Sequence, residues 1–109
     1  MPKMISLLPY LKALCEEKRL RAISLLLESE KCICELMEEL DLSQPAVSHH
    51  MKILKQAGLI RDRREGRWIF YALRKDKFST LNKMLQELIF EPVKQSNCEK
   101  GSIPLGRCS

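Results

Sequence analysis

Residues 40–73 read LDLSQPAVSHHMKILKQAGLIRDRREGRWIFYAL, and this stretch decides the expected fold. Ser43 or Gln44 can cap a helix, and a proline follows in the first turn, where its missing N–H would be unpaired anyway. Three apolar residues then recur at helical spacing and must face a core: Val47, Met51 and Leu54. Gly58 occupies the place of a glycine that stops a helix. The pattern predicts a helix between residue 43 and Gly58.

The opposite face of this helix is polar and lacks acids, which suits contact with phosphates and base edges. Its side chains are Gln44, Ser48, His49, Lys52 and Gln56. We expect Gln44, Ser48 and His49 to discriminate bases and Lys52 to bind phosphate. His50 lies nearer the apolar side, and we expect a half-buried hydrogen-bonding residue there instead of a metal ligand.

Two β-prone runs, residues 59–64 and 67–73, follow on either side of Glu65-Gly66. Gly66 can take the positive φ of a tight hairpin. Three cations flank the tip and are expected to bind phosphates: Arg63, Arg64 and Arg67. A basic hairpin after a polar-faced helix is the layout of a winged helix-turn-helix, with the helix in the major groove and the wing on the neighbouring backbone. We expect a mainly α fold of about five helices plus a two-stranded wing.

Apolar spacing predicts three helices upstream of this region. Met1 to Ile5 is expected to be a loose lead-in, followed by a short helix that ends near Cys15. A second helix begins at Glu16-Glu17, with Leu20, Ile23, Leu26 and Leu27 on its inner face. A third, acidic helix over about 32–40 supports the DNA-reading helix.

A final helix is expected over residues 75–90, ended by Pro92. Its apolar stripe can cap the monomer core or form a dimer seam, and we favour the seam because other elements already supply a core. The residues expected at the seam are Leu7, Leu8, Leu11, Leu81, Leu85 and Leu88. Residues 1–90 then form one DNA-binding and dimerisation domain, and residues 91–109 a mobile C-terminal tail.

The net charge of +5 is unevenly distributed. From Lys52 to Lys77, nine Lys or Arg against three acids give +6, whereas from Glu28 to Asp41 six acids against one Lys give −5. A basic block can simply solvate a surface, but this block coincides with the predicted helix and wing, which favours nucleic-acid binding.

No apolar run approaches the ~18 residues of a membrane span, and charged residues interrupt the start of the chain. We expect a cytoplasmic protein. Its five cysteines are then thiols, and the odd number argues against a closed disulfide framework.

Cys32 and Cys34 form the second chemical feature. They can be ordinary buried small residues, or they can bind one soft ion such as arsenic(III), antimony(III), zinc, cadmium or lead. On an ideal helix, positions i and i+2 point about 200° apart. We therefore expect a bound ion to distort the start of the third helix and to act through residues 41–43 on the DNA-reading helix. Cys15, Cys98 and Cys108 are the candidates for a third ligand.

Several runs together carry a resemblance: LLP at 7–9, KRLR at 18–21, CICEL at 32–36, SQPAVSHHM at 43–51, GL at 58–59 and RREGRW at 63–68. The chain resembles the ArsR/SmtB family of bacterial metal- and metalloid-responsive repressors, and within it the arsenical-resistance repressors. The resemblance implies a homodimer of winged helices, joined through the first and last helices, that binds an inverted-repeat operator. It also implies release when arsenite or antimonite binds Cys32 and Cys34.

The chain departs from that family in two places. Many arsenic repressors carry a further cysteine three residues after the Cys-x-Cys pair, where this chain has Met37, so the third sulfur ligand is open. Residues 75–90 lack the histidine ligands that zinc-sensing relatives place on the last helix. A thiol redox sensor and a sensor of cadmium, lead or zinc remain alternatives. An enzyme is not expected, because both histidines lie on the DNA-reading helix.

Overall fold

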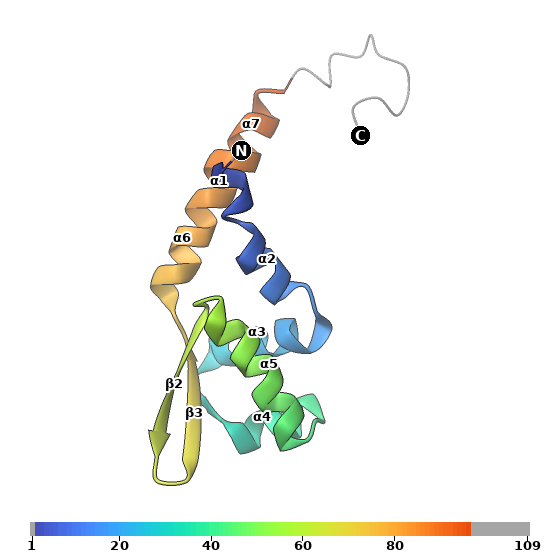
Figure 1. Cartoon of the computed structure of the whole chain (residues 1–109), viewed down its shortest axis with the longest axis vertical. Coiled ribbons are helices and arrows are strands. Elements are labelled where there is room, and N and C mark those ends of the chain that lie inside the picture. The colour runs from blue at the N-terminus through green and yellow to red at the C-terminus, as the bar shows by residue number, and fades with distance from the viewer. Residues whose placement is uncertain (1, 97–109) are drawn as a thin grey trace.

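The computed structural model describes residues 2–96, which form a winged lobe (residues 17–73) and a helical stem (residues 2–14 and 75–94) (Figure 1). Side-chain environments are described for residues 4–96. The elements are α1 (Pro2–Ile5), α2 (Leu8–Leu14), α3 (Glu17–Glu28), β1 (Lys31–Cys32), α4 (Ile33–Leu40), α5 (Gln44–Gln56), β2 (Ile60–Glu65), β3 (Trp68–Leu73), α6 (Lys75–Leu85), the π-helical turn η1 (Gln86–Phe90) and α7 (Glu91–Lys94). The predicted fold class, a mainly helical winged helix-turn-helix, is confirmed.

Helix α5 begins and ends as the sequence predicts. The hydroxyl of Ser43 accepts a hydrogen bond from the Ala46 N–H, which makes Ser43 the N-cap. At the other end Gly58 has a φ of +84°, the left-handed conformation that a glycine adopts without steric cost. The N–H groups of Gly58 and Leu59 then bond back to the carbonyls of Lys55 and Leu54, which closes the helix.

The wing has one strand more than predicted. The sheet order is β1-β3-β2, with both pairs antiparallel, and Cys32 of β1 lies opposite Phe70 of β3. A strand of two residues is too short to show alternation in sequence. The hairpin turn is also displaced by one residue, because Glu65 still pairs with Trp68 and leaves Gly66 and Arg67 as the turn.

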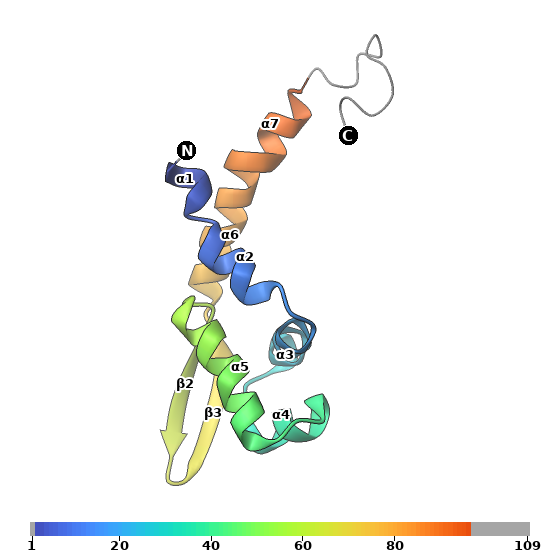
Figure 2. The ribbon, with the colours of Figure 1, turned by 45° about the vertical axis from the view of Figure 1, so that its right-hand side comes forward.

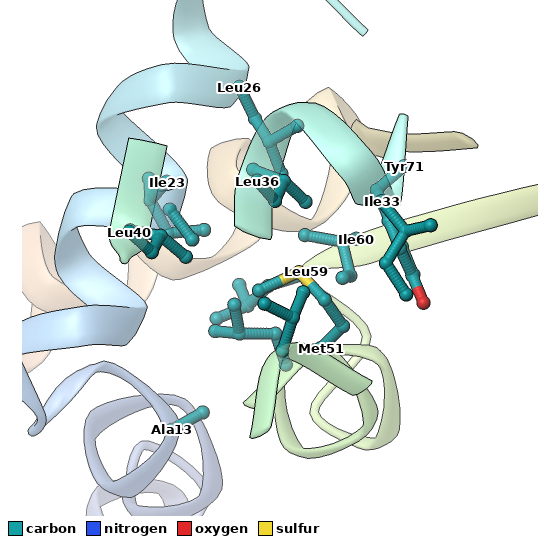
Figure 3. Packing of buried hydrophobic residues seen from close by; sticks show 13 residues of the cluster. Ala13, Ile23, Leu26, Ile33, Leu36, Leu40, Met51, Leu59, Ile60 and Tyr71 are labelled. Atoms are coloured by element: carbon teal, nitrogen blue, oxygen red, sulfur yellow. The ribbon is translucent and has the colours of Figure 1, made fainter. Parts of the chain in front are cut away.

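The core lies between α3, α4, α5 and the inner face of the sheet (Figure 3). Leu36, Leu40 and Leu54 are fully buried there. Two residues expected on the inner face of α3 are instead exposed, Leu20 by 52% and Leu27 by 71%. The buried side of α3 is set by Ala22, Ile23 and Leu26, and Leu20 and Leu27 lie on a flank of the helix, about 100° around its axis from that side.

The final helix runs past Pro92, so the expectation that it ends there is wrong. In the turn before that proline, the Glu91 N–H donates to the carbonyl of Gln86, five residues back. The hydrogen bonds of the helix therefore already depart from α-helical spacing where the proline ring enters, and the helix continues to Lys94.

The expectation of a loose lead-in at the start of the chain is also wrong, because Pro2–Ile5 form one helical turn. Of the predicted tail, residues 91–94 are helical and 97–109 lie outside the described part.

Candidate DNA-binding surface and thiol site

Helix α5 lies beside the wing hairpin in both ribbon views (Figures 1 and 2), and α5 contacts β2. Gln44, His49 and Lys52 are exposed on this helix, and Ser48 is half-buried. Lys55, two turns beyond Ser48, pairs with Asp62 of β2 at 3.0 Å between Nζ and Oδ1. This ion pair ties the helix to the wing and keeps the polar face of α5 next to the hairpin.

The three wing arginines have different surroundings. Arg64 and Arg67 are exposed, and the Arg67 guanidinium lies 5.6 Å from the ring centroid of Trp68. Trp68 itself is 45% exposed on β3. Arg63 instead donates two hydrogen bonds to the Glu30 carboxylate, at 2.9 Å from Nε and 2.8 Å from Nη2.

His50 links α5 to the corner between α2 and α3. Its Nδ1 lies 3.2 Å from Nη1 of Arg19, whose Nε donates to the carbonyl of Ala13 at 2.6 Å. Burial lowers the pKa of His50, although the Glu16 carboxylate 3.9 Å away acts in the opposite direction. The expected half-buried, hydrogen-bonding role of His50 agrees with this geometry.

The two thiols of the Cys-x-Cys pair already meet. Sγ of Cys32 lies 3.0 Å from Sγ of Cys34. Cys32 is not helical: it has extended backbone angles, φ −81° and ψ 156°, and is the N-cap of α4. The expectation that both sulfurs point apart and must distort the helix to meet is therefore wrong, because the 200° separation holds only when both residues lie within a helix.

Hydrogen bonds around Cys32 complete a capping box. Its sulfur accepts from the Cys34 N–H at 3.3 Å, and its own N–H donates to Oε1 of Glu35 at 2.9 Å. Burial opposes ionisation of Cys32, but the hydrogen bonds from the thiol and the N–H of Cys34 outweigh it and lower the pKa of the Cys32 thiol. The hydrogen bond to Cys32, followed by burial, raises the pKa of Cys34. The hydrogen bonds around Cys32 thus favour its thiolate form.

The DNA-reading geometry has counterparts in known proteins. A family model described as the bacterial regulatory protein arsR family matches residues 16–62. A helix-turn-helix transcriptional regulator of Methanocaldococcus jannaschii is 40% identical over 78 residues, which cover 71% of this chain and 88% of that protein. The chain belongs to the ArsR family. The prediction of a DNA-binding transcriptional regulator is thereby confirmed.

Two further members help to place this ArsR-family chain. The arsenic resistance transcriptional regulator ArsR1 of Pseudomonas putida is 38% identical over 79 residues, which cover 72% of this chain but only 62% of ArsR1. The structure of HlyU from Vibrio cholerae matches 78% of this chain and 94% of its own, with a TM-score of 0.65 and 30% identity. None of the helices described here is long and apolar enough to cross a membrane.

The thiol pair supplies two ligands for a soft ion. Two sulfurs bonded at ~2.3 Å to one tetrahedral zinc would lie roughly 3.8 Å apart. The observed 3.0 Å therefore needs only a small change in either side chain. Within the described residues, no group of three His, Cys, Asp or Glu side chains is arranged to hold a metal.

A third ligand is not assigned within the described residues. Cys15 is exposed, and the 12 residues of α3, about 18 Å long, separate it in the chain from the thiol pair. Cys98 and Cys108 lie outside the described residues.

The residues expected at the dimer seam divide into three groups. Leu7 and Leu81 are buried within the single chain, Leu85 and Leu88 are half-buried, and Leu8 and Leu11 are 46% and 40% exposed. Four apolar residues that the sequence reasoning did not select are also exposed on the stem: Met4, Ile5, Phe90 and Val93. The i, i+3 spacing of the last two was a usable signal.

Proposed function

We propose that this regulator is a cytoplasmic homodimeric repressor that binds an inverted-repeat operator and is released when arsenite or antimonite binds Cys32 and Cys34. The observation that carries the proposal is the contact between the two sulfurs at the N-terminus of α4. Only residues 41–43 separate α4 from α5, so the thiols lie in the supporting half of the helix-turn-helix pair.

DNA binding is assigned to the exposed face of α5 and to the wing. Gln44, Ser48 and His49 provide base contacts, and Lys52 provides a phosphate contact. Arg64 and Arg67 bind phosphates from the wing. Arg63 was expected to do the same, but its donors are directed to Glu30 and Glu65, so we give it a different role below.

The thiol chemistry rests on the hydrogen bonds of the pair. When bound, a trivalent arsenic or antimony centre joins both sulfurs as one soft-metalloid site. Both cysteines bind as thiolates, and the hydrogen bonds that lower the pKa of Cys32 favour that form at Cys32. The third position is filled by an exogenous thiol, by hydroxide or by a cysteine beyond residue 96.

The same sulfur contact favours a second candidate, a redox sensor. Two thiols in contact can form a disulfide: a peroxide oxidises one thiol to a sulfenic acid and is reduced to water, and the second thiol displaces a further water. Cadmium, lead or zinc sensing is a third possibility that uses the same two sulfurs.

A gel-shift assay separates these functions. The probe is a duplex selected by the protein from a random-sequence pool. We expect arsenite to release wild-type protein from this duplex, and the Cys32→Ser/Cys34→Ser variant to stay bound. Release of that variant by arsenite would reject the site, whereas release of wild type by peroxide but not by arsenite would support the redox sensor. Cys15→Ser is the matched thiol control and is expected to respond like wild type.

A further inference from the structure

The outer face of the wing sheet carries a row of side chains that joins the thiol site to the wing. Cys32 of β1 lies directly opposite Phe70 of β3, and Phe70 lies directly opposite Arg63 of β2. Residues directly opposite each other in antiparallel strands share one face of the sheet. Cys32, Phe70 and Arg63 therefore form one row across all three strands.

Direct contacts reinforce this row. The guanidinium of Arg63 lies 4.5 Å from the ring centroid of Phe70. Its Nε and Nη2 donate to both carboxylate oxygens of Glu30, two residues before Cys32. The hydrogen bond from Arg63 lowers the pKa of Glu30, so the pair is ionised at neutral pH. Two sets of contacts thus hold the chain segment that ends in Cys32 against the wing: the backbone pairing of β1 with β3 and the bidentate ion pair between Glu30 and Arg63.

This arrangement gives the thiols a short connection to the wing. Since Cys32 belongs to β1 and not to α4, a change at its sulfur acts first on a segment that is hydrogen-bonded to β3. Coupling between two sites needs an element whose position both sites affect, and β1 meets that condition.

We propose that Glu30 and Arg63 are positioning residues that couple the Cys32–Cys34 pair to the orientation of the wing. This inference rests on the proposed function, in which ligand binding at the thiols weakens operator binding. It assigns Arg63 to coupling instead of phosphate binding, and it assigns the signal to the β1–β3 pairing in addition to the α4–α5 turn.

The test compares Glu30→Gln, Arg63→Gln and the double variant of the full chain with two matched controls. Glu28→Gln removes a carboxylate two residues away that is 3.7 Å from Lys31, and Arg61→Gln removes an exposed cation from the same face of β2. The first readout is operator affinity with and without arsenite. The second is arsenite uptake, measured as protection of thiols from a thiol reagent. The third is the emission of Trp68, the only tryptophan of the chain, which lies on β3.

We expect both single variants to bind arsenite within about twofold of wild type but to lose the arsenite-induced change in Trp68 emission. The ratio of operator affinities without and with arsenite is expected to fall at least ~5-fold, the lower end of typical allosteric coupling. The double variant is expected to match the singles, because all three break one ion pair. Both controls are expected to behave as wild type.

Several results would overturn the coupling role. One is an unchanged affinity ratio and emission response in Glu30→Gln. Another is a pair of opposite effects, in which Glu30→Gln binds the operator more tightly than wild type and Arg63→Gln binds it more weakly. That result would indicate that Arg63 is a phosphate contact. Loss of arsenite uptake in the variants would make the pair a structural support. If arsenite does not release wild type from the operator, the proposed function fails. The change in Trp68 emission on peroxide oxidation, compared between wild type and the Glu30 and Arg63 variants, then tests the coupling by itself.

Discussion

At the scale of single residues, Cys32 combines three structural tasks. It pairs with Phe70 in the sheet, its sulfur caps α4, and the same sulfur contacts Cys34. The sequence identified Cys32 and Cys34 as a pair but placed them both in a helix. Whether the first cysteine lies at the N-cap or within the first turn is a boundary question of one residue, and sequence patterns do not resolve boundaries that finely.

Gly58 allows a residue-scale prediction about stability. A Cβ added there would meet only the flexible side chain of Lys77, with the nearest atom at 3.6 Å, so the effect of substitution is confined to the backbone. We expect Gly58→Ala to reduce the free energy of unfolding by about 1–2 kcal/mol, measured by urea denaturation. Gly58→Asn is expected to lose less, because Asn tolerates the left-handed conformation. Equal losses for both variants would contradict this explanation.

His50 makes stability depend on pH. Because burial holds its folded pKa below the ordinary value of 6.5, the folded state favours neutral imidazole. The contribution is therefore present above pH 6.5 and is lost as pH falls from there through the folded pKa. We expect the urea midpoint of wild type to fall between about pH 7.5 and pH 5.5 by more than that of His50→Gln. An equal fall of the urea midpoint in wild type and in His50→Gln would contradict this explanation.

At the scale of elements, α5 and the wing act as one surface because the Lys55–Asp62 ion pair and the contact between α5 and β2 hold them together. The positions of both were predictable, since a capped amphipathic helix, a stop glycine and a basic hairpin all leave local signals. Strand β1, by contrast, has no local signal in the sequence, because it is only two residues long. The role of Glu30 also escaped prediction, because its partner Arg63 lies 33 residues away in the sequence.

The wing yields a prediction about salt dependence. Each phosphate contact releases a condensed counterion, so losing one contact lowers the slope of log affinity against log salt concentration by about 1 per subunit. We expect Arg64→Gln to lower this slope, measured by fluorescence anisotropy on the selected duplex. Arg61→Gln, on the face of β2 that does not carry Arg64, is expected to leave the slope unchanged. An equal change in both variants would indicate a general charge effect.

At the scale of the whole molecule, the stem exposes apolar side chains that the lobe does not cover. Met4, Ile5, Leu8 and Leu11 lie on its N-terminal segments, and Phe90 and Val93 near the end of the long helix. Exposed apolar surface on a small protein is stabilised by association, which supports the proposed dimer. The periodicity of the sequence predicted the apolar stripes but not which of their residues are buried within the chain. The burial of Leu7 and Leu81 depends on how the N-terminal helices pack against the final helix.

Leu8 tests the dimer. Replacing this 46% exposed leucine by arginine places a charge on the proposed seam, and we expect the dimer dissociation constant to rise at least ~10-fold in sedimentation velocity. Leu27→Arg makes the same change at a 71% exposed leucine of α3 and is expected to leave the association unchanged. If only the Leu27 variant lost the ability to associate, the interface would lie on α3 and not on the stem.

The N-cap position of Cys32 has a genetic consequence. Serine is among the best N-cap residues, so a Cys32→Ser allele keeps the start of α4 intact while it removes a thiolate. Under the proposed function, such an allele is expected to yield a folded repressor that stays on its operator in the presence of arsenite, and mixed dimers with wild-type subunits would make that phenotype dominant. A screen for mutants in which arsenite no longer induces the target gene would therefore yield substitutions at Cys32 more often than a screen for mutants that no longer repress the gene.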